Sequence, residues 1–324
     1  MLSISFIIPL YNGEKYIARC LKSILTLNNI SGELIIINDG STDKSIEITR
    51  STITTYNTNN FNIIIESQDN SGVANARNRG IQLATKKYIS FVDQDDYLLP
   101  EFVTQFEKYS NSNYDIIIGG FCRIDQDGKS IKKFIPTDNE FSKYCLTYPW
   151  GRLIKKDFLT ANNIKFLKTG IGEDVYFDLV AYSYTYKIKM ISNYSYVWFM
   201  NTESVSNTSY VYLNKKTDPI FTFNKILSDI PSTNKKNDIC LEYYFIKFII
   251  WFLLSNAKKS DYPDIIKERT RLFMWLNTNF PNYMYNPFLK LSMPKGDTLF
   301  NRFVVSIYFK LYQFDLDKLL LRIL

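Results

Sequence analysis

Apolar residues follow two different periods in the first part of this 324-residue chain. Short runs rich in Ile, Leu and Val alternate with longer segments whose apolar residues recur every three or four positions, as Ile17, Leu21 and Ile24 do. The short runs predict strands at residues 3–9, 34–37, 61–66 and 88–92. The longer segments predict helices at residues 14–27 and 73–84 and from near Asp43. This alternation favours an α/β sheet over an antiparallel barrel or a helical bundle.

A polar loop follows the carboxyl end of each predicted strand. In open α/β sheets ligands bind outside that edge of the sheet. We therefore expect four loops to converge on one crevice, namely residues 9–12, 38–43, 68–72 and 93–96.

The fourth loop is acidic, and the chain contains no histidine. Asp93, Asp95 and Asp96 stand within four positions, and carboxylates packed so closely repel one another unless a cation joins them. Oxygen ligands beside a phosphate suit Mg²⁺ or Mn²⁺; the alternative is an acidic turn without a ligand. Without imidazole, proton transfer at a site would fall to another side chain, for which a carboxylate is the natural candidate.

The four cysteines and the amino terminus predict a cytoplasmic protein. The cysteines are widely spread without a Cys-x-x-Cys pair, so we interpret them as reduced thiols and not as a zinc site. The apolar amino terminus lacks a basic leader and a small-residue cleavage site, and we expect it to be the first strand.

Charge divides the chain near residue 207. Residues 1–207 hold 22 basic and 22 acidic residues, whereas residues 208–324 hold 17 basic and 10 acidic residues, so the net charge of +7 lies in the last third. That third is rich in aromatic residues and shows helical patterns broken by prolines. We therefore predict a domain at residues 1–207, with halves 1–100 and 101–207, and a mainly helical accessory region at 208–324.

The basic and aromatic last third has three interpretations. Amphipathic helices with Lys and Arg beside aromatic residues suit the cytoplasmic face of a membrane, to which the protein would attach peripherally. Plain core helices or a homo-oligomer interface are the alternative. Nucleic-acid binding is disfavoured because the basic residues are dispersed. The two most apolar runs, residues 243–254 and 300–312, fall short of the ~20 apolar residues of a membrane-spanning helix.

Five short motifs stand in the order typical of family 2 glycosyltransferases, which the chain resembles over roughly residues 1–207. The motifs are Pro9-Leu-Tyr11-Asn12, Asn38-Asp39-Gly-Ser-Thr-Asp43, Asn70-Ser-Gly72 with Ala76-Arg77-Asn78-Arg-Gly80, Phe-Val-Asp93-Gln-Asp95-Asp96, and Glu173-Asp174. The resemblance implies a GT-A fold with a Rossmann-like, mostly parallel central sheet. It also implies a nucleotide-diphosphosugar donor, a divalent cation (Mn²⁺ or Mg²⁺) and inversion at the anomeric carbon.

The resemblance further implies roles in a donor pocket. Asp95 is the metal ligand, and Asp93 contacts the donor's ribose or, through water, the cation, while Asp96 orients the pair. The nucleotide is contacted by Pro9, Tyr11, Asp39, Asn70 and Arg77, and family habit favours a UDP-sugar. The family often has Asp where this chain has Asn38. Structural alternatives are a helix-capping turn at Asp39 and a surface ion pair at Arg77.

The same resemblance places the general base at Asp174, beside Glu173, whose charge would raise the pKa of Asp174. Gly170 and Gly172 would let the backbone place it; the alternative is an acidic first turn of a helix, favoured by the helix dipole. Trp150 and Arg152 lie in a segment similar to one that contacts the acceptor in polysaccharide-assembling members, although Trp150 suits a core position equally well.

These features predict an inverting, metal-dependent glycosyltransferase that acts in bacterial surface polysaccharide synthesis. Its acceptor would be a hydroxyl of a glycan or lipid-linked glycan. The alternatives are a catalytically inactive scaffold of the same fold and a sugar-nucleotide pyrophosphorylase. The second would need a Gly-rich, Arg-containing loop after the first strand, which Pro9-Leu-Tyr-Asn-Gly does not provide.

Overall fold

A computed structural model describes residues 1–56, 60–169, 172–201, 218–231, 238–258 and 260–324. The chain divides into two compact units. The sheet unit comprises Met1–Asp138, Thr147–Thr169 and Glu173–Thr202, and the helical unit comprises Asn139–Leu146, Gly170–Gly172 and Glu203–Leu324. The boundary predicted at residue 207 falls outside the described residues.

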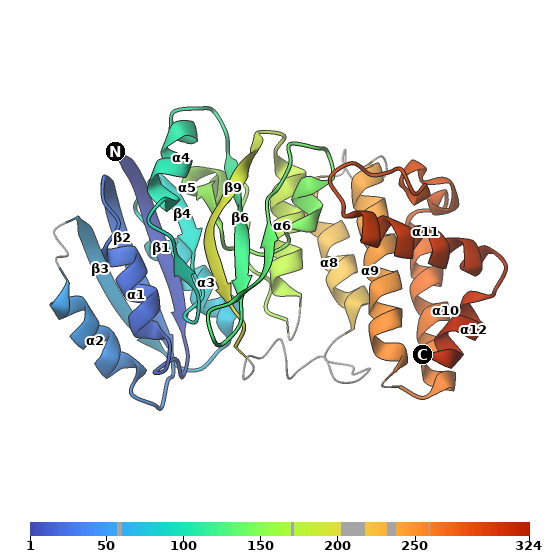
Figure 1. The fold of residues 1–324 in the computed structure, drawn as a ribbon, viewed down its shortest axis with the longest axis horizontal. Helices are drawn as coiled ribbons and strands as arrows, with labels where there is room; N and C mark the ends of the chain where they lie inside the picture. The colour runs from blue at the N-terminus through green and yellow to red at the C-terminus, as the bar shows by residue number, and fades with distance from the viewer. Residues whose placement is uncertain (57–59, 170–171, 202–217, 232–237, 259) are drawn as a thin grey trace. The chain divides into compact units, whose positions relative to one another are not determined.

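The first half of the sheet unit is a parallel α/β arrangement (Figure 1). Its strands pair in the order β3-β2-β1-β4, and every pair is parallel. The strand order reverses between β1 and β4, and right-handed crossovers then place α3 on the opposite face from α1 and α2. The elements are β1 (Leu2–Leu10), α1 (Ile17–Leu25), β2 (Ile30–Asp39), α2 (Ser45–Thr55), β3 (Phe61–Gln68), α3 (Val73–Leu83) and β4 (Tyr88–Phe91). The strands and helices predicted for this half are confirmed.

The core of this half lies on both faces of the sheet. Phe6, Ile7 and Ile8 are consecutive in β1 and all fully buried, as expected for a strand covered by helices on two sides. Helix α1 buries Ile17 and Leu21 at the predicted spacing. All four cysteines are free thiols.

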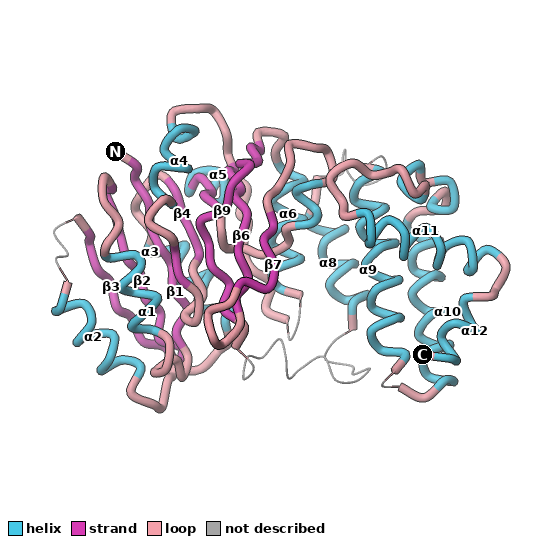
Figure 2. The backbone as a smooth tube through the Cα atoms, in the orientation of Figure 1, coloured by secondary structure: helices cyan, strands magenta, loops and turns pink. Residues whose placement is uncertain are grey.

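The second half of the sheet is mixed in strand direction. Figure 2 shows its strands beside those of the first half. The order continues β4-β8-β6-β9-β5, with β7 paired to β6. Strand β8 is antiparallel to both β4 and β6, whereas β6 and β9 are parallel. The expected sheet is therefore wholly parallel only over β1–β4, and β6–β9 is the one parallel pair among the described strands of the second half. An apolar pattern predicts a strand but not its direction. The elements are β5 (Tyr97–Leu98), α4 (Phe102–Ser110), β6 (Ile116–Ile124), β7 (Ser130–Phe134), β8 (Arg152–Lys155), α5 (Lys156–Ala161), α6 (Glu173–Tyr184) and β9 (Ile188–Phe199).

The described part of the helical unit contains α-helices and short 3₁₀ turns, as the proline-broken pattern predicted. Helix α9 contacts α10, α11 and α12 and buries much of its length. The side chain of Asp238 caps it by accepting hydrogen bonds from the backbone N–H groups of Cys240 and Leu241. The elements are η1 (Ser142–Cys145), α8 (Pro219–Asp229), α9 (Ile239–Ala257), α10 (Tyr262–Asn279), η4 (Tyr283–Tyr285), η5 (Pro287–Leu289), α11 (Leu299–Gln313) and α12 (Asp317–Ile323).

Helix α9 is also long and apolar enough to cross a membrane. Among the described residues it alone meets this test, with a mean hydropathy of 1.4 over its most apolar window. The sequence had predicted no run of that length. Half of the window is buried inside the protein, and the core helix of a soluble protein meets the same test of length and composition.

Candidate functional site

The candidate site lies at the carboxyl ends of β1 and β4, where the strand order reverses. The loops that follow these strands are joined by a reciprocal pair of hydrogen bonds. The backbone N–H of Tyr11 donates to Oε1 of Gln94 at 2.8 Å, and Nε2 of Gln94 donates to the carbonyl of Tyr11 at 2.9 Å. In open α/β sheets ligands bind outside the carboxyl ends of the strands at such a reversal point.

The loop after β2 is tied to the loop after β1. The backbone N–H of Asn12 donates to Oγ of Ser41 at 3.1 Å, and the N–H of Thr42 donates to Oδ1 of Asn12 at 2.9 Å. Asn12 has a φ of 46°, a left-handed conformation that asparagine adopts more readily than most residues.

Asp39 joins the loop after β3 to the end of β2. Its buried carboxylate accepts hydrogen bonds from the backbone N–H groups of Ser71 and Gly72 and from Nε2 of Gln68, each at 2.8 Å. Both carboxylate oxygens are therefore engaged in holding the loop. The remaining lone pairs are what Asp39 could offer a nucleobase.

The other predicted nucleotide contacts differ in exposure. Tyr11 on the loop after β1 and Asn70 on the loop after β3 are exposed, whereas Pro9 is buried in β1 opposite Ile37. Gly40 has a φ of 75°, and a Cβ added there would lie 2.9 Å from the backbone nitrogen of Asn70. The close approach of these two loops thus requires glycine at position 40.

Arg77 connects two of the predicted site carboxylates. Its side chain is 4% exposed and lies on α3, with Nη1 2.5 Å from Oδ1 of Asp174 and Nη2 2.8 Å from Oδ1 of Asp93. Burial alone would lower the pKa of Arg77, but the charges of Asp174 and Asp93 outweigh it and raise that pKa. Arg77 therefore pairs with site carboxylates and not with a surface one. Its buried Nε has no hydrogen-bond partner among the described residues.

Asp174 stands in the first turn of α6, and its side chain is 29% exposed. Burial raises its pKa to about 8; the nearby charge of Arg77 opposes this, while the negative charges of Glu173 and Asp93 add to it. Gly172, just before the helix, has a φ of 90°, which glycine adopts without strain. Gly170 lies outside the described residues.

Asp96 is a buried anchor of the acidic loop. Its carboxylate accepts hydrogen bonds from the hydroxyl of Tyr196 at 2.6 Å and from the backbone N–H of Phe199 at 2.8 Å. The same hydroxyl accepts a hydrogen bond from the backbone N–H of Asp93 at 3.2 Å. Asp96 and Tyr196 thus fix the backbone that carries Asp93 and Asp95.

Asp95 is more open and has partners that the sequence reasoning missed. Nδ2 of Asn201 donates to its Oδ2 at 3.0 Å, and Nη2 of Arg19 donates to its carbonyl at 2.7 Å. Burial, with the charge of Asp93, raises the pKa of Asp95. Arg19 carried no signal because it lies between the apolar positions of α1, and nothing in the sequence linked Asn201, which follows β9 far along the chain, to Asp95.

The residues of the acidic loop fit a divalent cation that also binds the donor's phosphates. No group of three or more His, Cys, Asp or Glu residues within the described ranges could hold a metal by itself. Both carboxylate oxygens of Asp96 are engaged, whereas Arg77 contacts one oxygen of Asp93 and Asn201 one oxygen of Asp95. Asp95 and Asp93 are thus the two candidate ligands, and Mg²⁺ sites commonly use one or two carboxylates together with substrate phosphates.

Trp150 and Arg152 lie in the core and not in the crevice. Trp150 is 6% exposed and stacks between Tyr196 and Tyr148, with ring centroids 4.4 and 4.7 Å away. The guanidinium of Arg152 is 1% exposed and contacts Asp178 at 2.7 Å and the hydroxyl of Tyr182 at 2.6 Å. Neither side chain offers a surface to an acceptor, so the expected acceptor contacts are corrected to core roles.

Comparisons with known sequences place the chain among glycosyltransferases. The model of the family described as Glycosyl transferase family 2 matches residues 5–169. Glycosyltransferase GlyA of Streptococcus pneumoniae is 27% identical over 63% of this chain and 31% of its own length, so the chain spans less than a third of that relative. Glycosyltransferase EpsJ of Bacillus subtilis is 26% identical over 91% of this chain and 90% of its own length. A poly(ribitol-phosphate) beta-glucosyltransferase of Bacillus spizizenii is 31% identical over 74% of this chain and 38% of its own length.

A solved structure shares the fold. The crystal structure of S. aureus TarS 1–349 in complex with UDP-GlcNAc superimposes with a TM-score of 0.71, covering 97% of this chain and 92% of that one, at 17% identity. This likeness shows the fold, a GT-A sheet with a helical C-terminal region, as expected from the sequence.

Proposed function

The chain belongs to glycosyl transferase family 2, and on that premise we propose that it moves a sugar from a nucleotide-diphosphate donor to a hydroxyl of a bacterial surface polymer. A UDP-sugar is the proposed donor, and a glycan or lipid-linked glycan is the proposed acceptor. The names of the relatives support this choice: one acts on poly(ribitol phosphate), and TarS was crystallised with UDP-GlcNAc.

One observation carries the proposal: a buried arginine at the crevice joins the carboxylate assigned to the donor side, Asp93, to the carboxylate assigned as base, Asp174. An inverting transfer needs both functions within one sugar's width, because the base and the leaving group act on opposite faces of the anomeric carbon. Because Asp93 and Asp174 contact the same guanidinium, the two carboxylates are close enough to act on one sugar.

Asp174 takes the proton of the acceptor hydroxyl in this proposal. A pKa of about 8 makes its carboxylate a better base than an ordinary aspartate, at the cost of a smaller ionised fraction at neutral pH. Its partner Arg77 holds the carboxylate in place. The donor's phosphates would compete for the same guanidinium, whose Nε has no partner among the described residues.

Asp95 and Asp93 would hold the divalent cation, and Asp96 with Tyr196 would keep their backbone in place. When bound, the cation would neutralise the charge that grows on the leaving nucleoside diphosphate. Tyr11 and Asp39 stand on the two loops that would flank the nucleobase, and the exposed ring of Tyr11 is available for stacking.

The first test is whether a nucleotide sugar stabilises the protein. UDP-, GDP- and dTDP-sugars should be compared by thermal unfolding with Mn²⁺, since a ligand at 100 times its Kd adds about 2.7 kcal/mol to the free energy of unfolding. We expect UDP-sugars to give the largest shift. No shift with any of the three nucleotide sugars would contradict the proposed donor site and favour a scaffold.

The second test separates donor binding from transfer. Asp174→Asn should keep the donor-dependent thermal shift but lower transfer by about 10²–10⁴-fold, the usual contribution of a general base. The matched control is Asp157→Asn, an exposed carboxylate in the first turn of α5. Full turnover in Asp174→Asn would remove Asp174 from its proposed role.

A further inference from the structure

Helix α11 presents an apolar stripe to solvent. Leu299, Phe303 and Ile307 follow one another at four-residue spacing, and Phe300, Ile307 and Phe314 at seven-residue spacing, so all five side chains lie on one side. They are between 41% and 75% exposed. Three exposed apolar residues of the next segment are Leu316, Leu319 and Ile323. We call these eight side chains the α11–α12 face.

The opposite side of α11 already packs against its own unit. Val305, Tyr308 and Phe309 are buried, and the ring of Phe309 contacts that of Tyr283 with centroids 6.0 Å apart. Helix α11 is therefore apolar on two sides, one buried within its own unit and one exposed to solvent. An exposed apolar surface of this kind marks a site that binds a membrane or another apolar partner.

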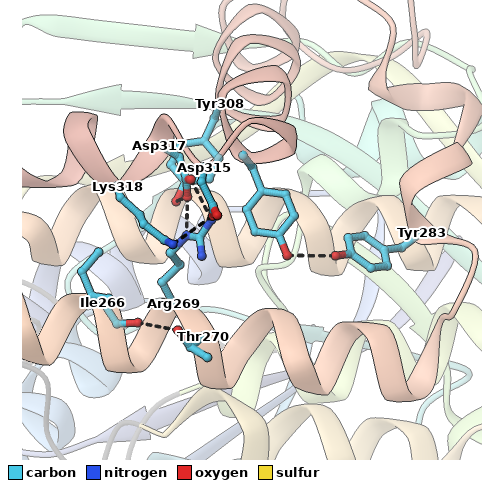
Figure 3. A network of polar contacts seen from close by, with 9 residues as sticks. Ile266, Arg269, Thr270, Tyr283, Tyr308, Asp315, Asp317 and Lys318 are labelled. Atoms are coloured by element: carbon cyan, nitrogen blue, oxygen red, sulfur yellow. Dashed lines mark hydrogen bonds and ion pairs between the residues drawn. The ribbon is translucent and has the colours of Figure 1, made fainter.

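An ion-pair network whose central pair, Arg269 and Asp317, is buried holds the corner between α11 and α12 (Figure 3). Arg269 of α10 contacts Asp317 through Nε at 2.5 Å and Asp315 through Nη2 at 3.0 Å. The hydroxyl of Tyr308 also donates to Asp317, at 3.1 Å. These contacts hold α11 and α12 against α10, so the exposed apolar side chains lie on helices whose positions are fixed by ion pairs and hydrogen bonds.

Charge around the face is positive once ion pairs are counted. The three acidic residues between 290 and 324 are all paired with basic groups: Asp297 with Lys247, Asp315 with Arg269 and Lys318, and Asp317 with Arg269. The same segment carries six basic residues, Lys290, Lys295, Arg302, Lys310, Lys318 and Arg322. Exposed Lys310 lies within the apolar stripe itself, and exposed Arg322 lies on α12.

We propose that the α11–α12 face docks the protein on an anionic lipid bilayer. Exposed aromatic and aliphatic side chains would enter the boundary between head groups and acyl chains, while Lys310 and Arg322 would meet lipid phosphates. A second copy of the chain is disfavoured as the occupant, because two identical faces would bring basic side chains together without an unpaired Asp or Glu side chain between residues 290 and 324 to meet them. This surface is independent of the proposed donor site.

Vesicle sedimentation tests the proposal on the full chain without any donor. We expect binding to phosphatidylglycerol vesicles at low salt, weaker binding to phosphatidylcholine vesicles, and a loss of the difference as NaCl is raised. The triple variant Phe303→Ser, Ile307→Ser, Phe314→Ser should bind phosphatidylglycerol vesicles at least ~10-fold more weakly, since three apolar side chains lose their burial. The pair Lys310→Glu, Arg322→Glu should lower binding to phosphatidylglycerol more than to phosphatidylcholine.

A control with three exposed apolar or aromatic side chains comes from the sheet unit. Ile131, Ile135 and Tyr186 are exposed to a similar extent, and their triple change to Ser should leave vesicle binding unaltered. Thermal midpoints equal to that of the wild type would show that both triple variants fold. Absence of wild-type binding to phosphatidylglycerol at low salt, or an equal loss in the control, would overturn the proposal. The proposal would also be overturned if sedimentation velocity showed a wild-type dimer that becomes monomeric only in the variant Phe303→Ser, Ile307→Ser, Phe314→Ser, while this variant still binds vesicles.

Discussion

Helix α6 carries two carboxylates one turn apart, and each pairs with a buried arginine. Asp174 contacts Arg77 at the crevice, and Asp178 contacts Arg152 in the core. Burial is the main cause that raises both pKa values, to about 8 for Asp174 and about 7 for Asp178, while the paired arginine opposes the rise in each case. By distance and by burial of the arginine the two pairs are alike.

They differ in whether the carboxylate can be reached. Asp174 and the second partner of Arg77, Asp93, are 29% and 28% exposed, whereas Asp178 is fully buried. A ligand can therefore replace a partner of Arg77, but none can reach the pair of Arg152. Of two chemically equal ion pairs on one helix, accessibility makes one a candidate for catalysis and the other a structural element.

The largest expected effect is a difference in the free energy of unfolding between variants of Arg152 and Arg77. Arg152→Met should lower the free energy of unfolding by about 3–5 kcal/mol, because it leaves the charge of Asp178 buried without a partner. Arg77→Met should lower it less, since water can hydrate the exposed parts of Asp93 and Asp174. Chemical denaturation of both variants measures the difference.

Donor binding should also distinguish the variants Arg77→Met and Arg152→Met. Arg77→Met should abolish the donor-dependent thermal shift in the protein that remains folded, whereas the folded fraction of Arg152→Met should keep it. Equal losses of stability in the two variants would show that the exposure of the carboxylates does not distinguish the pairs.

The parallel half of the fold was predictable because its cues are local. Each predicted strand in residues 1–92 has a continuous apolar run, and α1 follows its helical spacing at Ile17 and Leu21. The reversed direction of β8 was not predictable, since β8 pairs with β4 and β6, whose residues are some thirty or more positions away. The apolar composition of a four-residue strand specifies burial and carries no direction.

The site was predictable where motif order identifies loops and not where partners come from elsewhere. Arg77 contacts both Asp93 and Asp174, and Asp39 holds the loop after β3 at the end of β2, whereas the roles expected of these residues stay predictions. Arg152 was expected to contact the acceptor, and the sequence could not decide between that role and a core position for Trp150. Burial depends on tertiary neighbours such as Asp178 that sequence spacing does not reveal. The contact of Asn201 with Asp95 joins residues 106 positions apart for the same reason.

A smaller effect extends the comparison to neighbours in the acidic loop. Asp95 is partly exposed, whereas Asp96 is buried and accepts hydrogen bonds from Tyr196 and Phe199. Asp95→Ala should lower transfer by about 10–100-fold and remove its stimulation by Mn²⁺, as loss of a metal ligand would, while changing stability little. Asp96→Ala should instead lower the melting temperature. Undiminished Mn²⁺ stimulation in Asp95→Ala would assign the cation to other residues.

The smallest expected effect concerns the pKa of Asp174, and the direction in which the pH profile moves is the test. Asp174 must be ionised to accept a proton, so kcat/KM should rise with pH as the pH passes through its pKa of about 8. The negative charge of Glu173 raises that pKa, and Glu173→Gln should therefore lower it, moving the rise in kcat/KM to lower pH by less than about one unit, equivalent to under about 1.4 kcal/mol. Glu66→Gln, which removes a carboxylate paired with exposed Arg79 on the surface, should leave the profile in place. A profile that moves to higher pH in Glu173→Gln, or that moves equally in Glu66→Gln, would mean that the group titrating in catalysis is not Asp174.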